Sequence, residues 1–212
     1  MKFIETFISK FGHFLLRLKK WRFLLAFCEL PHQQIYGNPE VFIIMRFTYC
    51  PHCGNKLIKK EIGDEGLIPY CARCQVPLWD MFTTSVIVAV VNDDNEIALL
   101  RQGYVSAANH VCVAGIMKLG ESAEETAIRE IREEIGQTVK TLTYINSYPY
   151  EQKEMLMLGY KAVVEKADFV LSKEVDSVEW VKFDSALELL RKGSISWRLV
   201  KTVIEDKMKG KR

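Results

Sequence analysis

The sequence lacks a strong charge imbalance, an apolar run long enough to cross a bilayer, and an internal repeat. Its 212 residues carry 29 Lys and Arg against 27 Asp and Glu, which leaves a formal net charge of +2. A protein that binds nucleic acid without regard to sequence is expected to show a concentrated basic surface. The composition therefore argues against general nucleic-acid binding.

Residues 1–44 show the pattern of a basic amphipathic helix. A helix that crosses a bilayer needs about twenty consecutive apolar residues. The RLKKWR stretch ends the apolar run of this segment well short of that length. No small-residue site for cleavage of a signal peptide follows. Two interpretations stay open: an upstream start assignment, with Met45 close to the native start, or a native helix that makes peripheral membrane contact. Large apolar residues recur at helical spacing at Phe7, Phe11, Phe14, Leu15, Leu18, Trp21 and Leu25.

Four of the six cysteines form two CxxC pairs, whose spacing is typical of a zinc ribbon. Each pair can present two thiolates to one tetrahedral ion. Two disulfides would need an oxidising compartment, and a redox CxxC normally opens a helix in a βαβ unit; neither context is visible. We therefore predict a structural zinc site within residues 45–80 and a cytoplasmic location. The predicted ligands are Cys50, Cys53, Cys71 and Cys74.

The stretch GIMKLGESAEETAIREIREEIG, residues 115–136, predicts a helix with carboxylates beside its apolar face. Ser122 and Glu125 form a capping box, and Gly136 supplies a left-handed stop. The predicted apolar stripe contains Ala127, Ile128, Ile131 and Ile135, and the neighbouring carboxylates are Glu130, Glu133 and Glu134. Such a face can be an ordinary solvated, salt-bridged surface, or it can be a divalent-metal site for cleaving a diphosphate.

The same stretch resembles the Nudix box, G-x5-E-x7-R-E-U-x-E-E-x-G-U, where U is a bulky aliphatic residue. One departure is Gln137, which replaces an aliphatic residue and is expected to affect local packing. The resemblance implies an α/β fold, a Nudix α/β/α sandwich with a mixed sheet, over residues 81–212. The matching residues are Gly115, Glu121, Arg129, Glu130, Ile131, Glu133, Glu134 and Gly136.

The resemblance also implies a role for each motif residue. Glu130, Glu133 and Glu134 would bind magnesium or manganese, and one of them would double as the base that activates water. The backbone carbonyl of Ala114 or Gly115 would complete the ligand set. Glu121 would pair with Arg129 and brace the loop, which is a structural role.

A zinc ribbon followed by a Nudix domain resembles the NADH pyrophosphatase family, which also removes NAD caps from RNA. The resemblance spans about residues 49–203, and Glu174 falls where the family carries a further metal ligand. It implies metal-dependent hydrolysis of a nucleoside diphosphate linked to another moiety, either NAD(H)-like or ADP-ribose-like. It also implies an NAD-capped RNA end as a substrate and a homodimer as the assembly.

The sequence departs from that family where the substrate would bind. The family reads G-F-V-E where this chain has Gly115-Ile116-Met117-Lys118, and only Ser147 and Pro149 survive from its S-Q-P-W-P-F-P-x-S stretch. The loss of Phe at Ile116 is expected to weaken base stacking, and Lys118 is expected to favour a more anionic substrate. The predicted substrate contacts are Ile116, Lys118, Ser147 and Tyr150.

The remaining pattern predicts strands interleaved with helices, which favours the sandwich. We expect strands at residues 85–91, 96–101, 139–148, 155–164 and 177–183. Asp184 is expected to cap a short helix ending at Gly193, and Ser196 to start a terminal helix. A non-catalytic nucleotide-sensing module, with the ribbon as an interaction surface, is the alternative function. The four metal-directed glutamates favour an enzyme.

Overall fold

The computed structural model describes residues 47–79, 81–106 and 108–210. It divides into two compact units, residues 1–80 and residues 81–212. The predicted amphipathic segment 1–44 lies outside the described residues. Within the described ranges, no helix is both long enough and apolar enough to span a membrane.

The described part of the first unit is a small antiparallel sheet. Strand β1 (Ile58–Glu61) pairs with β2 (Leu67–Cys71), and β2 pairs with β3 (Val76–Pro77). Its buried hydrophobic residues are Cys50, Leu57, Ile68 and Cys71, with a few partly buried neighbours. Because so little apolar surface is buried, this unit depends on something other than hydrophobic packing for its stability.

The second unit is built on one mixed sheet, as predicted. Strand β4 runs parallel to β8, and the other neighbours are antiparallel, in the order β7-β8-β4-β5-β9 with β6 paired to β4. Strand β6 (Val113–Ile116) was not foreseen, because four residues give too short a pattern to recognise. The other strands are β4 (Thr83–Val91), β5 (Glu96–Arg101), β7 (Val139–Tyr150), β8 (Met155–Val164) and β9 (Ser177–Lys182).

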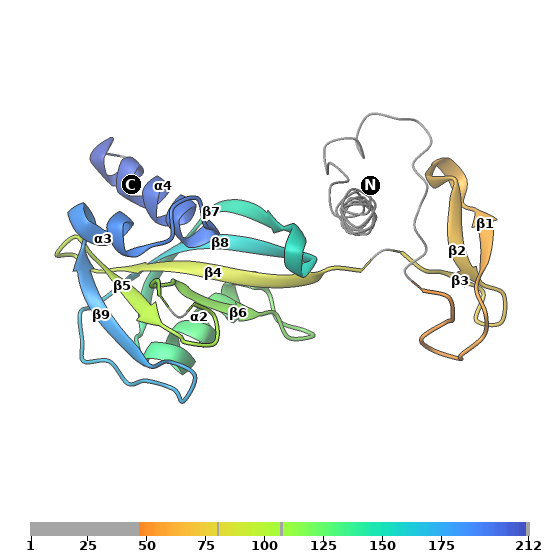
Figure 1. The fold of residues 1–212 in the computed structure, drawn as a ribbon, viewed down its shortest axis with the longest axis horizontal. Helices are drawn as coiled ribbons and strands as arrows, with labels where there is room; N and C mark the ends of the chain where they lie inside the picture. The colour runs from red at the N-terminus through yellow and green to blue at the C-terminus, as the bar shows by residue number, and fades with distance from the viewer. Residues whose placement is uncertain (1–46, 80, 107, 211–212) are drawn as a thin grey trace, which may run out of the picture. The chain divides into compact units, whose positions relative to one another are not determined.

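Helices cover both faces of this sheet, which confirms the α/β/α sandwich (Figure 1). Helix α2 (Ala123–Ile135) packs on one face, and α3 (Phe183–Leu189) and α4 (Ile195–Met208) pack on the other. Strand β4 supplies both cores because its side chains alternate between the two faces. Val86, Val88 and Val90 lie in the core under α2, and Ile87, Ala89 and Val91 lie in the core under α4.

Helix α2 begins and ends as the sequence predicts. The Ser122 side chain accepts a hydrogen bond from the Glu125 backbone N–H, and the Glu125 carboxylate accepts one from the Ser122 backbone N–H. Gly136 ends the helix with a left-handed φ of 69°. The predicted apolar stripe is wrong at Ile128, whose side chain is 43% exposed. Positions 123, 127, 131 and 135 lie at four-residue spacing and form one row along the helix. Ile128 is one residue further along the chain, so its side chain points away from that row.

The C-terminal helices differ from the prediction at their starts. Asp184 lies inside α3 rather than at its cap, and α3 ends at Leu189 rather than near Gly193. The cap of α4 is Ser194, whose side chain accepts a hydrogen bond from the Trp197 N–H. Two serines stand two residues apart, and the pattern alone did not distinguish the cap from the buried Ser196.

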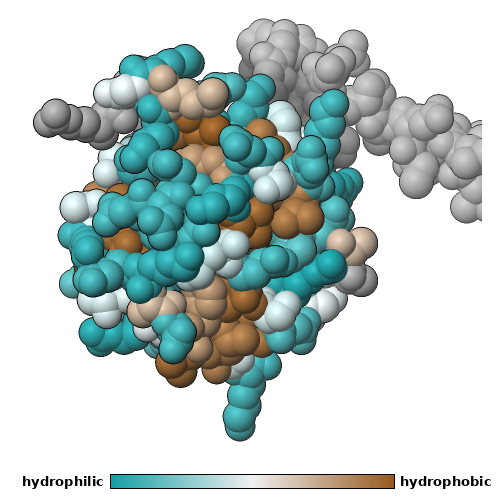
Figure 2. All heavy atoms as spheres, turned by 90° about the vertical axis from the view of Figure 1, so that its left-hand side faces the viewer, coloured by the Kyte–Doolittle hydropathy of each residue, from teal (hydrophilic) through white to brown (hydrophobic). Residues whose placement is uncertain are grey.

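A buried carboxylate ties together the end of the sheet where β4 turns into β5. Glu96 accepts hydrogen bonds from Asn92 Nδ2 at 2.8 Å and Lys166 Nζ at 2.7 Å, and Lys182 Nζ lies 3.0 Å away. Lys166, with help from Asn92 and Lys182, lowers the pKa of Glu96 to about 2. Figure 2 views this end of the unit, where hydrophilic side chains cover most of the face.

Candidate active site and cysteine cluster

The guanidinium of Arg129 connects the acidic residues of the box. It donates to both oxygens of Glu121 at 2.7 and 2.8 Å, to Glu130 at 2.6 Å and to Glu133 at 3.0 Å. It also donates to the backbone carbonyl of Ile116 at 3.2 Å, so it joins the helix to the end of β6. The Arg129 side chain lowers the pKa of Glu121 to about 2. One cation therefore offsets the mutual repulsion of several carboxylates.

Glu130 lies directly over Gly115. A Cβ atom added to Gly115 would overlap the carboxyl group of Glu130, which Arg129 holds in place. Gly115 and Ala114 lie on β6, which pairs with β4 next to α2. The glycine is therefore required for the close approach of the helix carboxylate to the strand rather than for a special backbone angle.

Glu134 is the most buried of the predicted ligands. Its side chain is 5% exposed, and its Oε1 accepts a hydrogen bond from Gln102 Nε2 at 3.2 Å. Its Oε2 is buried and has no hydrogen-bond partner among the described residues. Burial, with smaller contributions from the charges of Glu130 and Glu174, raises the pKa of Glu134 to about 7. An unsatisfied buried carboxylate oxygen is costly unless a ligand or a proton satisfies it.

The three box glutamates have different hydrogen-bond partners and different exposure. Glu133 is half exposed and Glu130 is mostly buried, and each has one oxygen on Arg129. Within the described residues, the hydrogen bonds leave one oxygen of each of the three glutamates without a protein partner. Across the same ranges, the only group of metal-ligating atoms that lies within 4.8 Å is made of cysteines. The carboxylates thus offer free oxygens without being gathered around a common point.

Glu174 is brought toward this cluster by a loop that binds the end of α2. The Ser172 N–H donates to the carbonyl of Glu134, and the Val170 N–H donates to the carbonyl of Ile135. Glu174 is exposed, and its charge raises the pKa of Glu134, although less than burial does. Sequence-distant Glu174 and the box helix therefore lie on one side of the second unit.

A cavity of about 770 Å³ lies beside the glutamates. Its wall includes Gln102, which holds Glu134, and Ala114, which precedes Gly115. Tyr104 also lines it, and the charges of Glu174, Glu134 and Glu130 contribute, after burial, to a raised Tyr104 pKa. The volume falls in the range typical of pockets for small ligands, roughly 300–1,000 Å³.

Sequence reasoning missed Gln102 and Tyr104. Both follow the buried strand β5, and a polar residue directly after an apolar strand was the available signal. The loop that carries them is fixed by the Gly103 N–H, which donates to Asp176 Oδ2 at 2.7 Å. This bond also joins the Tyr104 loop to the segment that carries Glu174.

The predicted substrate contacts do not all meet at the cavity. Tyr150 lines it, whereas Ile116, Lys118 and Ser147 do not and are exposed to solvent. The Lys118 backbone N–H instead donates to Glu121 Oε2 at 3.1 Å. Gln137 is buried and donates to the backbone carbonyls of residues 167 and 168, so this departure from the box is accommodated by local packing.

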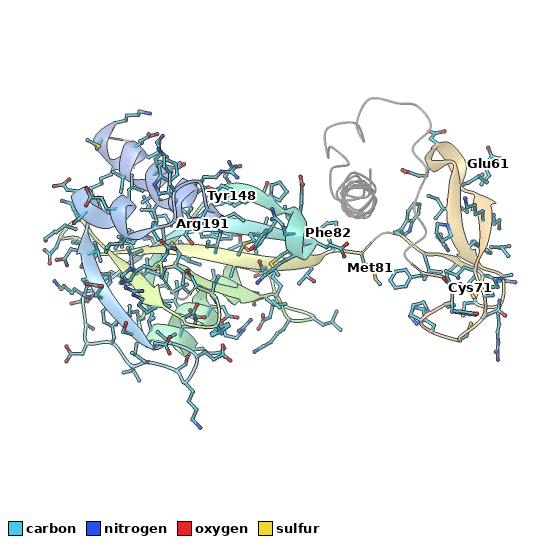
Figure 3. All side chains as sticks on the ribbon, viewed as in Figure 1. Glu61, Cys71, Met81, Phe82, Tyr148 and Arg191 are labelled. Atoms are coloured by element: carbon cyan, nitrogen blue, oxygen red, sulfur yellow. The ribbon has the colours of Figure 1, made fainter. Side chains whose placement is uncertain are left out.

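The four cysteines of the first unit gather into one cluster. Their sulfur atoms all lie within 4.8 Å of one another, and all four thiols are free of disulfides. Gly54 and Gln75 directly follow the two CxxC pairs and have positive φ angles of 70° and 59°. The N–H of each donates to the backbone carbonyl of the first cysteine of its pair. The Cys74 N–H lowers the pKa of Cys71 to about 7, which favours the thiolate that metals bind. The donor set fits a tetrahedral metal ion. Figure 3 labels Cys71 within this unit.

Comparisons with known proteins agree with this geometry. The NAD-capped RNA hydrolase NudC of Edwardsiella ictaluri is 29% identical over 157 residues, which are 74% of this chain and 60% of the relative; the Escherichia coli protein is 28% identical with the same coverage. The chain thus spans about 60% of the length of these relatives.

Solved structures show the same fold. A NUDIX hydrolase from Nitrosomonas europaea superposes with a TM-score of 0.58 at 16% identity, covering 77% of this chain and 94% of that protein. The NUDIX domain of Shewanella oneidensis NrtR, complexed with ADP ribose, gives a TM-score of 0.51 at 12% identity, with 66% and 93% covered. The sequence profile of the NUDIX domain matches residues 81–203. The chain belongs to the NUDIX domain family.

Proposed function

We propose that this protein hydrolyses the diphosphate of a nucleotide linked to another moiety, of the NAD(H) or ADP-ribose type. The observation that carries the proposal is the unpartnered buried oxygen of Glu134, whose other oxygen is held by Gln102, a residue that lines a cavity of nucleotide size. A carboxylate oxygen in that position is suited to a ligand that brings positive charge. The relatives' activity on NAD-capped RNA supports the same substrate class.

The chemistry of the donor set fits magnesium or manganese. Both are hard cations that take oxygen ligands, and Glu130, Glu133 and Glu134 each have a carboxylate oxygen free of protein partners within the described residues. Glu174 and the backbone carbonyl of Ala114 or Gly115 are the further proposed ligands. A divalent cation bound there would neutralise phosphate charge and make a water molecule more acidic.

The protein's own side chains would position the substrate and move a proton. One of the box glutamates would accept a proton from water, and Gln102 fixes the orientation of Glu134. The cavity would hold the nucleoside, with Tyr104 and Tyr150 as flat apolar surfaces for a base or a ribose. Ile116, Lys118 and Ser147 would contact parts of the substrate that extend outside the cavity.

The cysteine cluster is proposed to hold a structural zinc ion. Four thiolates would fill a tetrahedral coordination shell and leave no open position for substrate, so this ion would contribute folding energy. An NAD-capped RNA end as a second substrate and a homodimer as the assembly are also part of the proposal.

A hydrolysis panel tests the proposed function. The full chain, supplied with magnesium or manganese, is incubated with NADH, NAD, ADP-ribose, dinucleoside polyphosphates and NAD-capped RNA. We expect two nucleoside monophosphate products from NAD(H) or the corresponding pair from ADP-ribose, and no release without the divalent cation. Nucleotide binding without any product would instead indicate a sensing module.

A further inference from the structure

The cavity beside the glutamates has one strongly basic wall. Arg191 and Lys192 come from the connection between α3 and α4, and Arg198 comes from the second turn of α4. Figure 3 labels Arg191 on the side of the sheet where α3 and α4 lie. The described residues that line this cavity include no Asp or Glu. The fully charged side chains among the described lining residues are therefore all basic.

These three cations are available to a ligand. Among the described residues none of them forms an ion pair with a carboxylate. The Arg198 guanidinium lies 4.9 Å from the centre of the Tyr148 ring, which orients the side chain without neutralising it. By contrast, Lys201 on the same helix is paired with Glu205 at 3.7 Å.

A buried hydroxyl also lies in the same wall. Ser196 is 9% exposed and lines the cavity, and its Oγ accepts a hydrogen bond from the Cys112 N–H at 3.4 Å. The Ser196 hydroxyl also forms a side-chain hydrogen bond with Cys112. The three cations, rather than this hydroxyl, are therefore the groups left for a negatively charged ligand.

The basic wall is distinct from the place where the diphosphate would react. Glu130, Glu133 and Glu134 do not line the cavity, and they meet it only through Gln102 and Ala114. Gln102 directly follows β5 and Ala114 lies on β6, whereas the basic residues come from α4 and the connection before it. A substrate with its diphosphate at the glutamates would thus present a different group to Arg191 and Lys192.

We propose that the basic wall formed by Arg191, Lys192 and Arg198 selects nucleotides that carry a phosphate group beyond the diphosphate that is cleaved. This inference rests on the proposed function, because it places the cleaved diphosphate at the glutamates. It identifies a phosphorylated nucleotide as the preferred substrate class. Guanidinium and ammonium groups match the oxygens of a phosphomonoester, which is doubly charged near neutral pH.

Matched substrates test this selection directly. NAD and NADP differ by one phosphate on a ribose 2′ position, and dephospho-coenzyme A and coenzyme A differ by one on a 3′ position. We expect kcat/KM to be about ten-fold higher for the phosphorylated member of at least one pair, the order expected from one added charge-assisted contact. The ratio should fall as salt is added, because exposed charges are screened.

Two variants assign the preference to the wall. In the double variant Arg191→Ala, Lys192→Ala, the ratio within the favoured pair should fall toward one. The variant Lys207→Ala removes an exposed lysine of α4 that does not line the cavity, and it should keep the wild-type ratio. Melting curves of all variants check that the exposed substitutions leave the fold intact.

The outcomes separate this inference from the proposed function. Equal or lower kcat/KM for the phosphorylated member of both pairs would overturn the inference while leaving diphosphate hydrolysis in place. An unchanged ratio in the double variant would do the same. Hydrolysis of none of the four compounds, and of neither NADH nor ADP-ribose, would overturn the proposed function itself.

Discussion

The cysteine cluster and the glutamate cluster are both suited to metal ions, but they are built in opposite ways. The cysteine sulfurs lie within 4.8 Å of one another in a unit with almost no other core. The glutamates stand on a helix packed against a large core, where Arg129 binds Glu130 and Glu133 and Gln102 binds Glu134. A site that holds a fold together must be closed, whereas a site that acts on a substrate must keep free oxygens.

The difference also lies in what supports each cluster. Around the cysteines, the backbone turns at Gly54 and Gln75 fix the ligands. Around the glutamates, a cation and an amide do so, through Arg129 and Gln102. The four predictions below test this contrast, from the largest expected effect to the smallest.

Loss of the cysteine-bound metal should unfold one unit and spare the other. In the variant Cys71→Ser we expect loss of bound zinc and of the ribbon's folded signals, because structural zinc contributes about 10 kcal/mol or more. Zinc content and two-dimensional NMR spectra measure both. The variant Cys112→Ala changes a buried cysteine outside the cluster and should keep its zinc. Simultaneous unfolding of the second unit would contradict the contrast.

The variant Glu134→Gln should show the reverse behaviour. We expect turnover to fall about a thousand-fold, since a proposed ligand and base is lost. The metal-free variant should melt higher than metal-free wild type by about a few degrees at neutral pH. Burial raises the folded pKa to about 7 from an ordinary 4.5, so wild type loses stability as pH rises between these values.

Measurements at several pH values check this sign. The melting difference should be small near pH 4.5, grow toward pH 7 and then level off. Glu124→Gln, on the same helix, is the matched control and should retain wild-type turnover. Equal turnover in Glu134→Gln and wild type would refute the assignment of the site.

The variant Gly115→Ala should damage activity through Glu130. The new methyl group overlaps the Glu130 carboxyl, and a displaced catalytic group costs about a hundred-fold in rate. If the effect passes through Glu130, adding Glu130→Gln should make the double variant no slower than Glu130→Gln alone. Additive losses in a kinetic cycle would show that Gly115 acts by another route.

The variant Glu96→Gln should affect stability with little effect on turnover. The pKa of Glu96 is lowered to about 2, so its contribution is complete above about pH 4.5 and is lost as pH falls toward 2. The melting temperature should therefore drop at pH 7 and match wild type near pH 2. The control variant Glu165→Gln removes one exposed ion pair with Lys140, and it should change the melting temperature little at either pH.

Local chemistry explains why α2 was the most predictable element. Its cap at Ser122 and its stop at Gly136 depend on neighbouring residues, and both were predicted from the sequence. The exposed Ile128 was missed because the helical period alone allowed a wider apolar stripe than the sheet covers. The start of α4 was missed for a similar reason. Ser194 and Ser196 are both possible caps in the sequence, and only the structure shows that Ser194 is the cap and Ser196 is buried.

The cavity was beyond sequence reasoning for a different reason. Tyr104, Tyr150 and Arg191 come from the loop after β5, the end of β7 and the connection between α3 and α4, and only the folded chain brings them to one cavity. No spacing in the sequence records that proximity. The reaction could be predicted from the resemblance to a family, whereas the surface that a substrate would contact is visible only in the folded chain.

The contacts of Arg129 bear on how the protein would respond to changes in metal supply. Its guanidinium pairs with Glu121, Glu130 and Glu133 and offsets part of their repulsion, so we expect the second unit to fold without a divalent cation. Magnesium scarcity would therefore leave the amount of folded second unit unchanged and reduce only its turnover. Zinc scarcity would instead leave chains with an unfolded first unit, which cellular proteases remove.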